Sequence, residues 1–385
     1  MSEAAEAASE RSVPIRLAVL AAPPLGHVSR LGEALKAAEA AAPGLFQIEV
    51  FVGGSVRSAQ RFFEGRYPLH EVRCTSRDWV EQGARFARAL RDQSVIDRFD
   101  AFLLDTNPIQ WTYAVDFARK PVAIITNCFL TAMAGRRTLQ VEAFEREADR
   151  FNAVRAEFGL RPLKSAYDLY ETDLVLLGDP QPIVDFIGAV PGNYKSCGPC
   201  FWSAPGVPPQ SISSFSNLLI ASLGSTGRPD FSAELVSAIA RAAGAEVTVC
   251  VGANPFKESP ARSAFDYEFE QAPLNQLIRH AAVVITQGGA GSTYQALHQG
   301  RPVFIAPTHK NHLILGQTLE AVGGGRVLNG DARTTEITHE LLETLRCEAA
   351  LFRGSAPSPG SEIMGRYLVG FLKSRVARST VQPAR

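Results

Sequence analysis

The feature that most constrains the fold is a regular alternation between short runs of aliphatic and β-branched residues and longer amphipathic stretches. This alternation is typical of parallel sheets whose strands are joined by crossover helices. It therefore predicts an α/β protein. In the first half we predict strands at 15–22, 46–52, 68–73, 101–105, 122–126 and 174–179, with helices at 28–40, 109–120 and 138–158.

Residues 198–216 interrupt the alternation with four prolines and several serines, a composition typical of a connection between domains. The alternation then restarts, which predicts a second doubly wound domain, and a length of 385 residues fits two domains of about 150 residues each. Predicted strands here are 218–222, 246–251, 283–286 and 302–306, with helices at 231–244, 273–281, 291–300, 336–345 and 361–376. The predicted boundaries are a disordered cap (1–13), two Rossmann-like domains (14–200 and 217–354) with a linker (201–216), a helix crossing back to the first domain (355–378) and a tail (379–385).

The charge balance excludes several kinds of partner. Lys plus Arg and Asp plus Glu each total 39, so no net field attracts the chain to nucleic acid or to an anionic membrane. The first residues lack the basic flank and apolar stretch of a secretory signal, and no apolar run approaches the roughly 20 residues of a membrane span. We therefore expect a cytoplasmic protein whose ligands are small molecules held by a local site.

In an open parallel sheet, ligands bind beyond the carboxyl ends of the strands, where the strand order reverses. In the first half this rule selects the loops 23–27 and 105–108, so His27 and Asp105 are predicted to be close neighbours. A His backed by a carboxylate is suited to act as a general base. The residues alone leave a second interpretation open, in which His27 starts a helix and Asp105 makes an Asx turn.

In the second half the same rule selects the loops 224–227 and 287–293, both rich in glycine. The second loop runs directly into a predicted helix, and a helix N-terminus preceded by glycines suits a phosphate group. The glycine spacing matches neither a Walker loop nor the dinucleotide fingerprint. A tight strand-to-helix turn without a ligand is the alternative interpretation.

Residues 265–325 resemble the donor-binding signature of the UDP-glycosyltransferases of the macrolide and plant secondary-metabolite type. The resemblance extends to residues 18–35, 100–126, 194–202 and 218–227, and thus to nearly the whole chain. It implies the GT-B architecture, in which two Rossmann-like domains face a central cleft. It also implies transfer of a sugar, UDP being the favoured carrier, to a hydroxyl of a small acceptor bound by the first domain. The reaction is expected to invert the anomeric centre and to need no metal or other cofactor.

The resemblance also implies roles for individual residues. His27 is expected to deprotonate the acceptor and Asp105 to support it. The remaining positions are expected to bind the donor: Ser225, Thr226, Gln287, Gly289, Gly291, Ser292 and Thr293 at the diphosphate, Ala272 and Gln295 at the nucleoside, and Asn311 and His312 at the sugar.

Three donor positions depart from the family pattern. Gln287 stands where the family has His, Gln295 where it has Glu, and Asn311-His312 where it has Asp-Gln. Each replacement still forms hydrogen bonds, but the charged acceptors for sugar hydroxyls are gone. Two alternatives follow: a nucleotide-sugar epimerase of the same fold, and a non-catalytic nucleotide-sugar-binding partner subunit. Loss of activity in His27→Ala would favour the transferase over the epimerase.

Other conspicuous residues carry weaker predictions. Cys197-Gly-Pro-Cys200 matches the thioredoxin redox motif, but the prolines that follow forbid the required helix, so structural thiols are favoured. His309 and His312 lack the carboxylate or thiol partners of a metal site. Four aromatic residues are either the lining of an acceptor cleft or ordinary core packing: Phe62, Phe63, Trp79 and Trp111.

Overall fold

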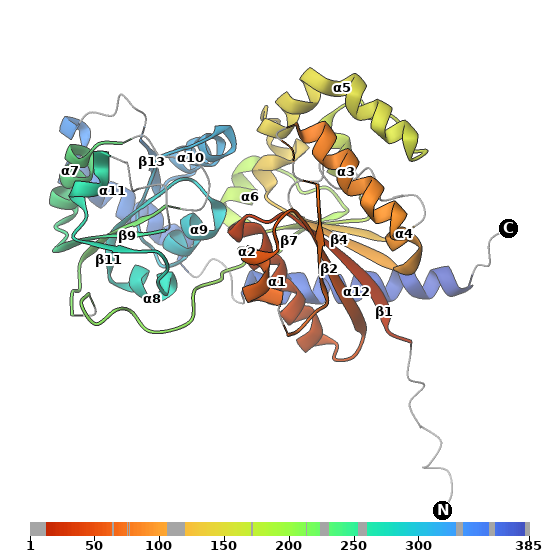
Figure 1. Cartoon of the computed structure of the whole chain (residues 1–385). Helices are drawn as coiled ribbons and strands as arrows, with labels where there is room; N and C mark the ends of the chain where they lie inside the picture. The colour runs from red at the N-terminus through yellow and green to blue at the C-terminus, as the bar shows by residue number, and fades with distance from the viewer. Residues whose placement is uncertain are drawn as a thin grey trace, which may run out of the picture.

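A computed structural model describes residues 13–381 except 106–119, 224–230, 253–259, 329–333, 354–358, Glu64, Thr75, Arg77, Glu171 and Ser213. In this described part the strands form two parallel sheets of seven and six strands, one in each half of the chain (Figure 1). The chain is therefore an α/β protein with two Rossmann-like halves, as its alternation predicts. The predicted helix 109–120, the loop residues 106–108, Trp111, Ser225 and Thr226 lie outside the described residues.

The N-terminal sheet has the strand order β3-β2-β1-β4-β5-β6-β7. Its strands are β1 (Ile15–Ala21), β2 (Phe46–Gly53), β3 (Leu69–Val72), β4 (Ala101–Asp105), β5 (Val122–Thr126), β6 (Leu174–Leu177) and β7 (Tyr194–Ser196). Strand β1 pairs in parallel with β2 on one side and with β4 on the other, so the chain order reverses between β1 and β4. The carboxyl ends of these two strands lie at the same edge of the sheet.

The C-terminal sheet repeats this arrangement with the order β10-β9-β8-β11-β12-β13. Its strands are β8 (Leu218–Ser222), β9 (Val247–Val251), β10 (Tyr267–Phe269), β11 (Ala281–Thr286), β12 (Val303–Ile305) and β13 (Gly325–Val327). The reversal lies between β8 and β11, which are parallel neighbours. Both reversals are where the sequence predicts them.

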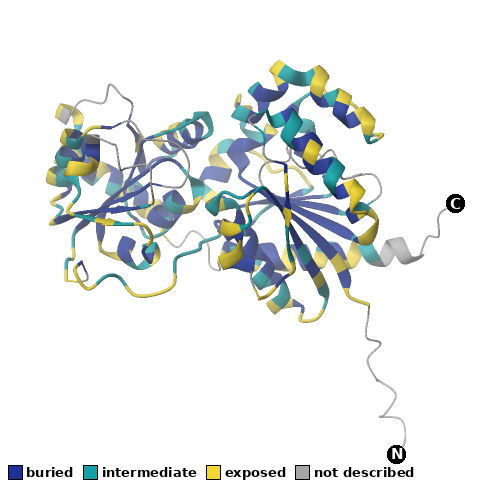
Figure 2. Ribbon diagram, viewed as in Figure 1, coloured by how far each residue is buried: buried dark blue, intermediate teal, exposed yellow. Residues whose placement is uncertain are grey.

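The helices cover both faces of each sheet, and the central strands β4, β5, β8 and β11 are buried throughout (Figures 1 and 2). The N-terminal half contributes α1 (Leu25–Ala41), α2 (Arg57–Phe63), α3 (Trp79–Asp92), α4 (Val95–Arg98), α5 (Leu139–Glu157) and α6 (Gln181–Ile187). The C-terminal half contributes α7 (Ala233–Ala243), α8 (Leu274–Leu277), α9 (Ala290–His298), α10 (Lys310–Val322) and α11 (His339–Ala349), followed by α12 (Gly360–Val381). Among the described helices, none is both long and apolar enough to span a bilayer.

Helix α1 positions one of the two predicted site residues. Its buried residues recur at helical spacing and include Val28, Leu31 and Leu35, so one face of the helix packs on the sheet. Burying each such side chain contributes about 1.5–3 kcal/mol relative to leaving it in water. The helix begins directly after β1, which holds its first turn at the carboxyl edge of the sheet.

The last helix, α12, lies against α1 of the N-terminal half (Figure 1). Met364 and Leu368 of α12 share a core cluster with Leu35 of α1. A Cβ atom at Gly365 would lie 2.6 Å from the backbone nitrogen of Ala38, so only glycine permits this approach of the two backbones. The end of the chain is thereby anchored to its beginning.

The structure adds short edge strands and several helices, including α2, α3 and α6, to the predicted elements. β7, β10 and β13 have three residues each, too few for a visible alternation. Helix α11 begins at His339, three residues later than the predicted start, because Thr338 caps it by accepting a hydrogen bond from Leu341 N. The predicted helix 273–281 is divided into α8 and a 3-10 turn that ends at His280.

Candidate active site

The reversal in the N-terminal sheet brings His27 and Asp105 together. His27 lies in the first turn of α1, and Asp105 is the last residue of β4 and is fully buried. Nδ1 of His27 forms a hydrogen bond with Oδ2 of Asp105, so the predicted proximity is confirmed. With the Nδ1 proton directed at the carboxylate, a neutral ring carries its acceptor lone pair on Nε2.

Arg30 completes this pair from the next turn of α1. Its Nε and Nη2 donate hydrogen bonds to Oδ1 of Asp105 at 3.1 and 2.5 Å, leaving Oδ2 to His27. Burial alone raises the pKa of the Asp105 carboxyl, but Arg30 and His27 together outweigh burial and hold that pKa below its ordinary value. Asp105 is therefore an ionised carboxylate at neutral pH, with a cation on one oxygen and an imidazole on the other.

The third donor of Arg30 leads into a buried polar network. Nη1 donates to Oδ1 of Asn127 at 2.9 Å, and Nδ2 of Asn127 donates to Oδ1 of Asp179 at 3.0 Å. The hydroxyl of Tyr294 in α9 donates to the same Asp179 oxygen at 2.7 Å, and the N–H of Cys128 donates to Oδ2 at 2.6 Å. Burial raises the pKa of Asp179. Hydrogen bonds thus connect the histidine pair to a helix of the other half.

The reversal in the C-terminal sheet places an uncapped helix N-terminus at its edge. Helix α9 begins at Ala290, and its N-cap residue Gly289 supplies no side-chain hydrogen bond. The N–H groups of Ala290, Gly291 and Ser292 belong to the first turn and lack an intrahelical acceptor. These groups, with the positive end of the helix dipole, make the turn suitable for an anion.

The loop in front of α9 passes close to α10. Gly288 has φ = +90°, and a Cβ atom there would lie 2.8 Å from the carbonyl oxygen of His312. Only glycine therefore allows the loop to lie this close to the backbone of α10.

Two glutamine side chains beside this turn have a hydrogen-bonding atom that is not used. Gln287 follows β11 and is buried, and its Nε2 has no hydrogen-bond partner among the described residues. Gln295 lies in α9, where Nε2 donates to the carbonyl of Trp202 at 2.6 Å while its buried Oε1 has no partner in the described part of the chain. A buried unsatisfied polar group costs about 1–3 kcal/mol, so each atom favours a ligand.

Comparison with known proteins gives sequence relatives and structural neighbours. No protein-family model matches the chain. A PGL/p-HBAD biosynthesis glycosyltransferase of Mycobacterium tuberculosis (strain ATCC 25177 / H37Ra) is 28% identical over 192 residues, which are 48% of this chain and 44% of the relative. The match therefore spans less than half of that relative's length.

The solved structures extend the similarity to nearly the whole chain. The calicheamicin glycosyltransferase CalG4 superposes with a TM-score of 0.68 at 16% identity, covering 96% of this chain and 100% of CalG4. The glycosyltransferase VinC, in complex with dTDP, superposes with a TM-score of 0.66 at 13% identity, covering 94% and 100% of the two chains. This chain therefore has the two-domain α/β fold of these GT-B glycosyltransferases. Its two sheets are the two Rossmann-like halves of that fold.

Within this GT-B frame, the structure uses two of the predicted donor residues elsewhere. Thr293 is buried, its N–H donates to Gly289 O at 3.2 Å, and its hydroxyl lies 2.9 Å from that of Thr286. The side chain of Asn311 contacts the N-terminal half, accepting from Leu139 N at 2.9 Å and donating to Gln140 Oε1 at 3.0 Å. These contacts hold both side chains within the protein, and the ligand contacts predicted for the two residues stay predictions.

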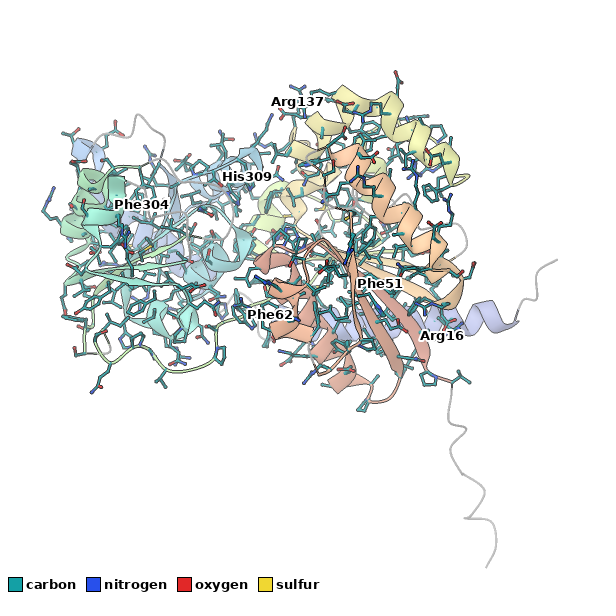
Figure 3. The ribbon with its side chains drawn as sticks, viewed as in Figure 1. Arg16, Phe51, Phe62, Arg137, Phe304 and His309 are labelled. Carbon is teal, nitrogen blue, oxygen red and sulfur yellow. The ribbon has the colours of Figure 1, made fainter. Side chains whose placement is uncertain are left out.

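The remaining predicted donor residues differ in their burial and in their side-chain contacts. Ala272 is buried in the core cluster with Leu277, so its side chain packs against protein, and the nucleoside contact predicted for it stays a prediction. His312 stacks on His309 with ring centroids 3.5 Å apart, and its Nδ1 lies 3.0 Å from the Thr308 hydroxyl. Figure 3 shows His309 in the region between the two halves. Burial and the neighbouring His309 lower the pKa of His312 to about 3, so its ring is neutral.

The cysteine motif is structural. Cys197 is buried and Cys200 lies with its Sγ 3.3 Å from Sδ of Met364 in α12. Neither residue lies in a helix, and burial raises the pKa of Cys200 to about 12 and that of Cys197 further. The thiolate that redox chemistry requires is therefore disfavoured.

The aromatic residues divide between the two interpretations. Phe63 is buried in the core, and Phe62 packs edge-on against Trp202 with ring centroids 4.8 Å apart (Figure 3). Trp79 instead lines a hollow of about 460 Å³ between α3 and α5, with Leu139, Ala143 and Phe151.

Across the described residues, no group of three or more His, Cys, Asp or Glu side chains is placed to hold a metal ion.

Sequence reasoning missed Arg30, Asp179 and Tyr294. Arg30 carries a readable signal, because it lies three residues after His27 and therefore on the same helix face. Asp179 and Tyr294 carry none, since they are 115 positions apart and meet only where the halves pack.

Proposed function

We propose that this chain transfers a sugar from a nucleotide diphosphate sugar to a hydroxyl of a small-molecule acceptor, with inversion at the anomeric carbon. The similarity to natural-product glycosyltransferases supports the class of reaction. The observation that carries the proposal for this chain is a pair of complementary sites. One half holds a histidine on a buried carboxylate, and the other holds a helix N-terminus with unused donors.

In the proposed mechanism His27 is the general base. Nε2 takes the proton of the acceptor hydroxyl while the acceptor oxygen attacks the anomeric carbon. The new C–O bond forms as the bond to the diphosphate oxygen breaks, and the nucleoside diphosphate leaves with the electron pair. Asp105 holds the Nδ1 tautomer and stabilises the imidazolium that results.

The donor is proposed to bind along the first turn of α9. The N–H groups of Gly291 and Ser292 hold the diphosphate, with Gly289 allowing close approach, and the helix dipole and Nε2 of Gln287 favour its negative charge. Oε1 of Gln295 accepts a hydrogen bond from a ribose hydroxyl. Ser225 and Thr226 stay predicted diphosphate contacts. Because backbone donors supply this stabilisation, we propose that no metal ion is required.

The donor nucleotide is proposed to be a uridine or thymidine diphosphate sugar. The sequence resemblance favours UDP, whereas VinC, which shares this fold, was crystallised with dTDP. His312 is proposed to contact the sugar. As a neutral ring it offers one donor and one acceptor, in place of a charged acceptor.

The acceptor is proposed to place its apolar part in the hollow between α3 and α5. Apolar side chains of Trp79, Leu139 and Phe151 line it, with charged groups of Asp78, Arg146 and other residues around them. Leu139 is also the residue that Asn311 holds from the C-terminal half, so the hollow adjoins a contact between the halves. About 460 Å³ suits a drug-sized molecule.

Nucleotide binding tests the donor site directly. Thermal unfolding of the protein is measured with UDP, dTDP and their sugars. A ligand at 100 times its Kd adds about 2.7 kcal/mol to the free energy of unfolding. We expect one nucleotide to stabilise the protein, Gln287→Ala to weaken that effect, and exposed Gln47→Ala to leave it unchanged. Stabilisation by none of them would refute the donor site. Transfer activity with the stabilising donor, lost in His27→Ala, would distinguish a transferase from an epimerase or a binding subunit.

A further inference from the structure

Arg30 is a largely buried cation that binds the same carboxylate as the proposed general base. Its side chain is 11% exposed, and all three of its guanidinium nitrogens donate hydrogen bonds, two to Asp105 and one to Asn127. A His–Asp pair needs no third charge to orient the imidazole. The position of Arg30 therefore calls for its own explanation.

The first effect of Arg30 is geometric. Both of its contacts to Asp105 fall on Oδ1, so Oδ2 is left to the Nδ1 proton of His27. The hydrogen bond to Asn127 holds another edge of the planar guanidinium group. A planar guanidinium group that is hydrogen-bonded along two edges fixes the rotamer of the Asp105 carboxylate. The carboxylate in turn fixes the orientation of the His27 imidazole.

The second effect is electrostatic. A buried carboxylate alone favours the protonated imidazolium, which cannot accept a proton from an acceptor hydroxyl. A cation on the same carboxylate opposes that protonation. Arg30 therefore favours the neutral imidazole, the form a general base must have before it reacts.

The other described groups around His27 and Asp105 add no net charge that would offset the effect of Arg30. Tyr170 and Cys200 approach from the N-terminal half, and burial raises the pKa of both, so they are neutral. Glu33 on α1 pairs with Lys36 at 2.7 Å. Asp179 lies beyond Asn127 and accepts three hydrogen bonds, one of them from Tyr294 of α9. Within the described residues, Arg30 is thus the cation bound directly to Asp105.

We propose that Arg30 is a positioning residue that fixes Asp105 and lowers the pH range over which His27 is protonated. The inference rests on the proposed function, in which His27 is the base. The network through Asn127 and Asp179 to Tyr294 holds Arg30 in this role, so the packing of the two halves contributes to the geometry of the base.

The test compares Arg30→Met, Arg30→Lys and the control Lys36→Met, which removes an exposed cation from the same helix. Two quantities are measured: the pH dependence of kcat/KM, and the midpoint of the His27 ring titration followed by NMR without substrate. In Arg30→Met both midpoints are expected to rise by about one pH unit. At a pH below the midpoint, this shift lowers the fraction of neutral His27 about tenfold. Lys36→Met is expected to change neither.

Arg30→Lys separates charge from geometry. Lysine retains the positive charge but lacks the planar guanidinium group. We therefore expect the midpoint of the His27 titration to stay unchanged, and kcat to fall about tenfold at constant KM. An unchanged midpoint in folded Arg30→Met would overturn the electrostatic part. Where Arg30→Met does not fold, Arg30→Lys carries the test, and a kcat equal to that of the unmodified protein would overturn the proposal.

Failure of the proposed function has a different signature. The unmodified protein would then show no transfer at any pH, while the NMR titration would still report whether Arg30 affects His27. The two hypotheses are therefore tested independently.

Discussion

The two halves of this protein share one sheet topology but place different chemistry at the equivalent point. Where the N-terminal sheet reverses its order, the charged groups of Arg30 and Asp105 bind each other and His27 binds the same carboxylate, all within that half. Where the C-terminal sheet reverses, the groups are uncharged: a helix N-terminus and the side chains of Gln287 and Gln295, each with one atom that has no hydrogen-bond partner among the described residues.

The difference follows from the cost of burial. Two buried charges must be paired from the moment the chain folds, because an unpaired buried charge costs several kcal/mol. A buried amide without a partner costs about 1–3 kcal/mol, which a stable protein tolerates until a ligand arrives. The N-terminal groups are therefore paired within the protein, whereas the proposed donor site leaves hydrogen-bonding atoms for the ligand that we propose.

The largest effect should come from removing the carboxylate that organises the N-terminal site. Asp105→Ala removes the carboxylate that two nitrogens of Arg30 bind, so we expect a loss of about 3–5 kcal/mol in the free energy of unfolding, measured by urea denaturation. Asp100→Ala, which breaks the exposed ion pair with Arg16, is the control and should cost about 1 kcal/mol or less. Equal costs would mean that charge pairing does not assemble the site.

Removing the imidazole should affect rate rather than stability. His27→Ala retains the Asp105–Arg30 ion pair, so we expect the protein to stay folded while kcat falls by about 10²–10⁴. Nucleotide binding at α9 should change little, because the donor site lies in the other half. A similar loss of nucleotide affinity would show that the two sites are not separable in this way.

The link between the halves should have a moderate effect. Tyr294→Phe removes one of three donors from the buried Asp179 carboxylate, and we expect a loss of about 1–3 kcal/mol in thermal or urea unfolding. Exposed Tyr367→Phe serves as the control and should be neutral. No change in Tyr294→Phe would indicate that Asp179 is satisfied without the C-terminal half.

The smallest predicted effect concerns pH and the C-terminal site. Burial lowers the pKa of His312 to about 3, below its ordinary value near 6.5, so the unfolded chain binds a proton that the folded chain does not. Between these values stability rises with pH, and acidification from pH 7 to 5 should cost on the order of 1 kcal/mol at this residue. His312→Asn should remove that part of the pH dependence, whereas His280→Asn at an exposed position should retain it.

Much of the fold was predictable because periodicity reports burial directly. Strands β4, β5 and β8 begin and end where the sequence predicts, since each is a continuous buried run between turn residues. The three-residue edge strands β7, β10 and β13 were not predictable, because a run as short as 325–327 carries no measurable period.

The candidate site was predictable only in part. His27 and Asp105 could be paired because a parallel sheet with a known reversal turns positions in sequence into neighbours in space. Asn311 was predicted to bind a sugar, but its amide holds α5 of the other half, a use no local pattern reveals.

The sequence by itself determined the alternation of strands and helices, the two points of reversal and the residues standing at their edges. These depend on local periodicity and on one general rule of sheet topology. The tertiary structure alone decided that Arg30 binds Asp105, that Tyr294 binds Asp179, and that the side-chain nitrogen of Gln287 has no partner in the described part of the chain. Such contacts depend on how side chains from distant segments fill the same space, and no short stretch of sequence contains that information.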